Sequence, residues 1–204
     1  MMGGDALAQG ADVALVNLVS GDVTYTPRAE SAGKVRPFMK LREGDRINIP
    51  AGGQIRVVFF EGARQELWAG PASFRTERTT SEPISGKVSG VMTLPMDVSQ
   101  RMARIPALIQ LSKLGGVQVR GVNRQQSATS ELPTTLAQAR ATYEKMRFEM
   151  PADDIAPELY LYAALYEVLA YDEMKVVVEE MRRKQPDNPD VKALNTWLTS
   201  QTSR

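Results

Sequence analysis

The chain has 204 residues, of which 43% are hydrophobic and 24% charged, and its 25 Lys and Arg nearly balance its 24 Asp and Glu. This composition is typical of a folded protein of one large or two small domains, without the strong charge that attracts nucleic acid. The complete lack of Cys and His excludes thiol nucleophiles, Ser-His-Asp triads and zinc sites built on thiolate or imidazole. We therefore expect no enzymatic activity, no cofactor, no metal site and no nucleic-acid partner.

A targeting pattern lies near the start of the chain. Ala6-Leu7-Ala8 followed by Gln9 has the small-x-small pattern that ends a secretory signal peptide. No run of about 18 apolar residues occurs, so the sequence predicts no membrane-spanning helix. We therefore expect an exported protein, located in the periplasm or outside the cell.

The segment from Asp12 to about Thr93 has the pattern of β-structure. Residues 13–19 form a β-branched apolar run that stops at the turn cluster Ser20-Gly21-Asp22. Residues 23–26 resume the run, which predicts a hairpin or a bulged pair. Residues 35–41 predict a further strand, which Pro37 restricts to a sheet edge or a bulge.

The most regular β pattern covers residues 46–68. Short apolar and alternating runs at 46–49, 54–60 and 64–68 are separated by turn residues at 50–53 and 61–62. In the central run Ile55, Val57 and Phe59 share one face, and Val58 and Phe60 share the other. Turn signals about every ten residues predict an all-β sandwich or barrel with both faces of this strand partly covered.

The spacing of these turns resembles the FecR domain. The matching features are Ser20-Gly21-Asp22-Val23, Leu41 with Gly44-Asp45, Ile49 with Gly52-Gly53, the segment 57–62, and Leu67. The resemblance covers residues 11–95 and implies a periplasmic all-β domain with a regulatory or binding role. It also implies one alternative for the whole chain, a periplasmic sensor or regulator. A second alternative is a module that binds glycan or peptidoglycan through the β domain.

Residues 96–133 are predicted to be a connecting segment. Asp97 is placed to cap a helix over residues 98–104, and Pro106 to start a second helix that runs to Leu114. Residues 123–131 are rich in Gln, Ser and Thr and have the composition of a linker.

Residues 134–204 carry a helical repeat. Ala139, Tyr143, Met146 and Pro151 recur 35 residues later as Met174, Val178, Met181 and Pro186, and Tyr162 recurs as Trp197. A period near 34 residues with a proline after each second helix resembles tetratricopeptide arrays. The expected fold is therefore α+β, an N-terminal FecR-like sandwich or barrel followed by a tetratricopeptide-like hairpin array.

One face of the helix beginning near Pro157 is a candidate partner-binding surface. Leu159, Ala163 and Tyr166 lie on that face at spacings of four and three residues, and tyrosine is a common anchor in interfaces. The alternative is that they fill the core between helices. We predict an exported scaffold or adaptor of the bacterial envelope. Its helices would bind a protein, and its β domain would bind an envelope polymer or a second copy.

Overall fold

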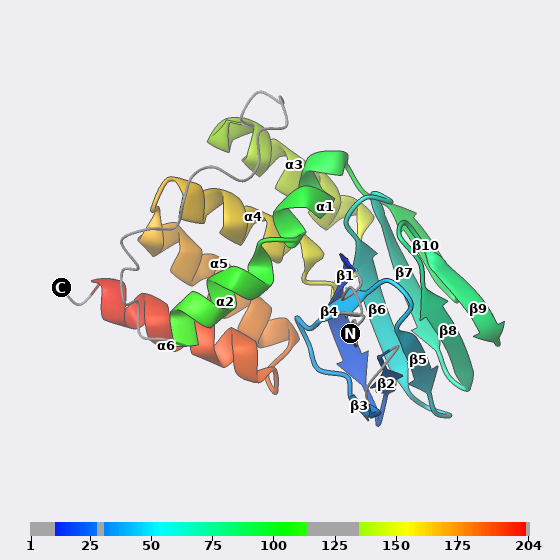
Figure 1. Cartoon of the computed structure of the whole chain (residues 1–204). Coiled ribbons are helices and arrows are strands. Elements are labelled where there is room, and N and C mark those ends of the chain that lie inside the picture. The colour runs from blue at the N-terminus through cyan, green and yellow to red at the C-terminus, as the bar shows by residue number, and fades with distance from the viewer. Residues whose placement is uncertain (1–10, 28–30, 114–134, 203–204) are drawn as a thin grey trace, which may run out of the picture. The chain divides into compact units, whose positions relative to one another are not determined.

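The computed structural model describes residues 11–27, 31–113 and 135–202. The chain divides into two compact units, Met1–Ala103 and Arg104–Arg204. The first unit holds two antiparallel sheets and a short helix, and the second unit is helical, so the α+β class is confirmed (Figure 1). The targeting pattern at residues 6–9 and the linker at 123–131 lie outside the described residues.

Ten strands form two five-stranded sheets in the described part of the first unit. The first sheet has the order β10-β7-β6-β1-β4, with β10 at Gly90–Thr93, β7 at Arg64–Ala69, β6 at Gln54–Phe59, β1 at Asp12–Ser20 and β4 at Lys40–Arg42. The second has the order β3-β2-β5-β8-β9, with β3 at Gly33–Lys34, β2 at Thr24–Thr26, β5 at Arg46–Ile49, β8 at Ala72–Thr76 and β9 at Ser81–Ser85.

The two sheets enclose one apolar core, as in a sandwich. Ile55, Val57 and Phe59 of β6 are fully buried in the same cluster as Ile47 of β5 and other residues of the second sheet. Across the core, the rings of Trp68 on β7 and Phe74 on β8 stack with centroids 4.8 Å apart. The predicted alternation along β6 is therefore confirmed, and Val58 on the opposite face is buried as well.

The chain passes from one sheet to the other after β1, so the predicted β1–β2 hairpin is wrong. β1 pairs with β4 and β6, whereas β2 pairs with β3 and β5. The passage runs through Gly21, whose φ of 78° favours glycine. Turn residues alone do not distinguish a hairpin from a change of sheet, since both reverse or bend the chain.

The predicted strand over residues 35–41 is also wrong. Its middle is a turn in which Phe38 takes a φ of 59°, and only its last residues belong to β4. The Phe38 N–H donates to the carbonyl of Val16 at 2.7 Å, which ties the turn to β1. Pro37 has no N–H to donate to a strand ladder, so a turn suits this position better than a strand.

Helix α1 spans Met96–Met102 and completes the first unit by packing against β6. Its Val98 and Met102 are buried. Asp97 is not the cap that the sequence predicts, because Pro95 takes the N-cap position and no side chain caps the helix. Asp97 lies instead in the first turn, where a negative charge also favours the helix.

The second unit contains five helices within its described residues: α2 at Ile105–Lys113, α3 at Leu136–Glu149, α4 at Ala156–Glu167, α5 at Tyr171–Lys184 and α6 at Pro189–Thr202. Helices α3 to α6 pack in chain order, each against the next, and α2 packs on α6. Ion pairs tie both ends of α2, from Arg104 to Glu167 at 2.9 Å and from Lys113 to Asp190. The predicted segment 96–133 is therefore divided, because α1 belongs to the first unit and α2 to the second.

The helix bounds follow the period found in the sequence. Helix α5 begins and ends 35 residues after α3, and both have 14 residues. Ala139 and Met146 of α3 are buried, as are their counterparts Met174 and Met181 of α5. None of the helices in the described ranges is both long and apolar enough to span a bilayer.

Candidate interaction surface

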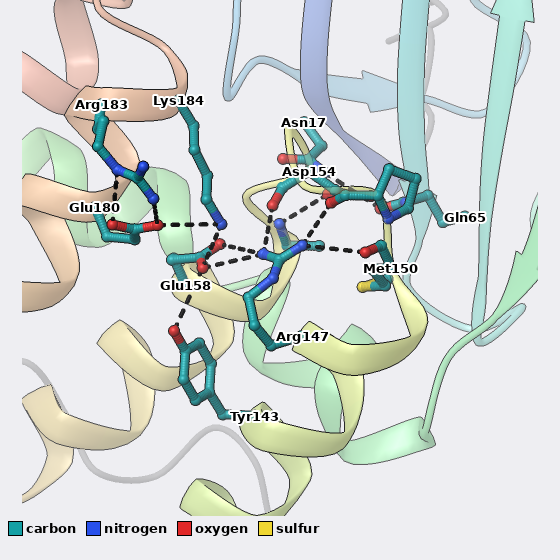
Figure 2. A network of polar contacts seen from close by, with 12 residues as sticks. Asn17, Gln65, Tyr143, Arg147, Met150, Asp154, Glu158, Glu180, Arg183 and Lys184 are labelled. Atoms are coloured by element: carbon teal, nitrogen blue, oxygen red, sulfur yellow. Dashed lines mark hydrogen bonds and ion pairs between the residues drawn. The ribbon is translucent and has the colours of Figure 1, made fainter.

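A buried glutamate joins three helices of the second unit. Glu158 of α4 is 0% exposed, and its two carboxylate oxygens each lie 3.0 Å from Nη1 of Arg147 on α3 (Figure 2). Lys184 Nζ, from the end of α5, donates to Glu158 Oε1 at 2.7 Å. Charge-assisted bonds of this length are among the stronger polar contacts in proteins, so this network fixes α3, α4 and α5 to one another.

The loop between α3 and α4 completes the network. Arg147 also donates to the carbonyl of Asp154 at 2.8 Å and to the carbonyl of Pro151. The buried carboxylate of Asp154 in turn accepts from the N–H of Ala156 at 2.9 Å, which satisfies one donor at the start of α4. Arg147 thus holds the loop as well as the helices.

The chemistry of the network is that of a group of contacts that stabilises the fold. Tyr143 of α3 donates to Glu158 Oε1 across 3.5 Å, and burial, followed by the charge of Glu158, raises the pKa of Tyr143 to about 12. The Glu158 carboxylate has no exposed surface, so a substrate has no access to it in this conformation. The described residues also bring together no group of three acidic side chains able to hold a metal ion.

The first unit buries a glutamate of its own. Glu66 on β7 is 1% exposed and accepts from Thr80 Oγ1 at 2.8 Å, from Trp68 Nε1 at 3.1 Å and from the hydroxyl of Ser81. Arg64 Nε forms an ion pair with it at 2.9 Å. These donors come from β7 and from the start of β9, so the contacts join the two sheets.

The three residues predicted to bind a partner lie on α4 in different environments. Leu159 is 0% exposed and Ala163 is 3% exposed, so neither offers surface to a partner in this conformation. Tyr166 is partly exposed, with its ring centroid 6.1 Å from that of Trp197 on α6. Of the three, Tyr166 alone is placed to touch another molecule.

Tyr166 belongs to an aromatic cluster on α4, α5 and α6. Tyr171 of α5 meets Trp197 edge to face, with centroids 6.0 Å apart. Burial, and then the neighbouring Tyr171, raise the pKa of Tyr166. Trp197 is 8% exposed, so the cluster presents only the partly exposed Tyr166 and Tyr171, and tyrosine is a residue type that often anchors partners.

A groove between α5 and α6 is a surface that the sequence did not reveal. It is lined by Lys175, Val176, Glu179, Glu180, Arg182, Arg183, Pro186, Lys192, Asn195 and Thr196. The α5 side follows a stripe at helical spacing, and Val176 within it is 71% exposed. Each stripe alone has the pattern of a solvated helix face, and only the packing of α6 on α5 makes a groove.

Positive charge exceeds negative charge in this groove. Arg182 pairs with Glu179 at 2.8 Å, and Arg183 pairs with Glu180. The Arg183 hydrogen bond lowers the pKa of Glu180. Within the described residues no ion pair is found for Lys175 or Lys192. The arginine and glutamate charges of the groove balance each other, so the two lysines give the groove a net positive charge.

Comparisons with protein-family models, curated proteins and solved structures give no match to this chain.

Proposed function

We propose that this protein is a non-enzymatic scaffold or adaptor whose helical unit binds a protein partner. The observation that carries the proposal is the α5–α6 groove, whose lining combines the exposed apolar side chain of Val176 with charged residues. An apolar contact inside a polar rim is the usual composition of a protein-binding surface.

The architecture supports this role. The 35-residue offset between α3 and α5, with Pro151 and Pro186 following these helices, is what tetratricopeptide-like hairpins would have. We propose that the first unit is a FecR-like sandwich and that the protein works in the periplasm or outside the cell. Both arrays and sandwiches of these kinds present binding surfaces on a rigid frame.

Tyr166, which is not among the residues that line the groove, is proposed as a second partner contact of the helical unit. It is the partly exposed member of the predicted trio on α4. A truncation to Ala is expected to weaken partner binding by about 1–3 kcal/mol, the range for a moderate aromatic anchor. Because its ring lies near Trp197, the melting temperature is measured on the same variant, and unchanged binding per folded molecule would remove Tyr166 from the surface.

Site-specific photo-cross-linking tests the proposal. A benzophenone side chain replaces Val176 in the groove or, as a control, Val91 on β10, which is also more than half exposed. Cross-linking in envelope extract from the source cells is expected to yield a distinct protein adduct from position 176 that position 91 does not give. The partner is then identified by mass spectrometry, purified and titrated against the unlabelled protein. Equal adducts from both positions, or a purified partner that does not bind, would contradict the proposal.

A further inference from the structure

The α5–α6 groove has a net positive charge, which indicates the chemistry of its partner. Four basic side chains line it, Lys175, Arg182, Arg183 and Lys192, against two acidic ones, Glu179 and Glu180. The two arginines are engaged by the two glutamates. The surplus positive charge therefore comes from Lys175 on α5 and Lys192 on α6.

We propose that this groove binds an acidic peptide segment that places one apolar side chain on Val176. This inference rests on the proposed protein-binding function and names the chemistry of the partner. Carboxylates of the peptide would lie against Lys175 and Lys192, while the exposed side chain of Val176 would bury an apolar group. Asn195 and Thr196 add polar side chains on the α6 side.

The lining favours a peptide over a nucleic acid. Glu179 and Glu180 would repel closely spaced phosphates, and the groove lining includes no aromatic side chain on which a base could stack. A peptide can instead alternate its charged and apolar side chains to match the lining. Because the lysines lie at the surface, the attraction is expected to weaken with salt.

Fluorescence anisotropy with the whole protein tests the proposal. The probe is a labelled peptide of Asp and Glu with one central Leu, and the control probe replaces each acid by Asn or Gln. The acidic probe is expected to bind at least about tenfold more tightly than the neutral one at low salt, and the difference is expected to shrink as salt rises.

Charge reversal locates the binding. In Lys175→Glu/Lys192→Glu, affinity for the acidic probe is expected to fall at least about tenfold, since like charges then face each other. The matched control Lys87→Glu/Lys145→Glu makes the same change of net charge on exposed lysines elsewhere and is expected to stay within about twofold. Far-UV circular dichroism checks that both variants are folded.

Three results would overturn the inference: equal binding of both probes, equal loss in both double variants, or tighter binding of single-stranded RNA than of the acidic peptide. If the acidic probe fails while cross-linking from position 176 still yields a partner, the acidic chemistry is wrong and the protein-binding function stands. If both fail, the groove is not a binding surface.

Discussion

The two units stabilise a buried carboxylate in different ways. In the sheet unit, Glu66 is surrounded by two hydroxyls and an indole N–H, with one arginine nearby. In the helical unit, Glu158 lies between two full cations, Arg147 and Lys184. Both glutamates are almost without exposure, so in each case the partners must replace the water that the carboxylate loses.

The difference follows from which side chains each architecture places within reach of the buried carboxylate. Thr80 and Ser81 stand where the turn after β8 enters β9, close enough to β7 that their short hydroxyl side chains meet the Glu66 carboxylate directly. Helix axes lie about 8–10 Å apart, so a central group on α4 needs long side chains from α3 and α5. Arg147 and Lys184 have that length, and they carry charge with them.

The largest effect is expected for Glu158→Gln. The neutral amide leaves Lys184, whose side chain is 7% exposed, with only the more distant carboxylate of Glu180, at 3.8 Å, as a negative partner. The free energy of unfolding is expected to fall by about 3–5 kcal/mol, the cost of breaking a buried ion pair. Denaturant unfolding followed by circular dichroism measures it. The exposed counterpart Glu179→Gln should cost no more than about 1 kcal/mol, and equal losses in the two variants would mean that burial does not strengthen the Glu158 pair.

The same substitution at the other carboxylate, Glu66→Gln, is expected to cost less. The hydroxyls of Thr80 and Ser81 can rotate to accept from the new amide, so only part of the bonding is lost. A loss of about 1–3 kcal/mol is expected, measured by the same unfolding experiment. A larger loss than for Glu158→Gln would reverse the comparison and show that the hydroxyl shell depends on the full charge.

The smallest effect concerns alkaline pH. Tyr143 has an ordinary pKa of 10.0 and a folded pKa of about 12, so the unfolded chain loses this proton first as pH rises. The stabilisation from neutral Tyr143 is therefore complete below pH 10 and is lost as pH rises through about 12. Tyrosinate absorbance near 295 nm, compared between the parent and Tyr143→Phe, should assign one late titration to this residue. An assigned titration near pH 10 would show that neither burial nor the charge of Glu158 raises the pKa of Tyr143.

The sequence predicted the strands and helices themselves better than it predicted which of them pair or pack together. The alternation of Ile55, Val57 and Phe59 and the helix started near Pro106 are local patterns, and both are confirmed. The separation of β1 from β2 depends on pairing with strands far along the chain, which local turn residues do not encode.

The candidate site shows the same limit. Tyr166 could be proposed from the sequence because it is one aromatic residue on one helix face, and its role stays a prediction. The α5–α6 groove was missed because Lys175 and Lys192 stand on separate helices, each in a stripe that resembles a solvated face. Glu158 was missed because it lies at the start of a largely apolar helix, where an acid gives no sign of the two cations that meet it.

The position of Glu158 within the repeat has a consequence for assembly. Thirty-five residues later stands Ala193 on α6, so α4 and α6 differ at this point although Leu159 and Leu194, Tyr162 and Trp197 match. Repeated helices risk docking in each other's places during folding. Were α6 to occupy the place of α4, Arg147 and Lys184 would meet the methyl group of Ala193 in place of the Glu158 carboxylate. Glu158 therefore distinguishes α4 from α6. Only the native order of these similar helices places a carboxylate between Arg147 and Lys184.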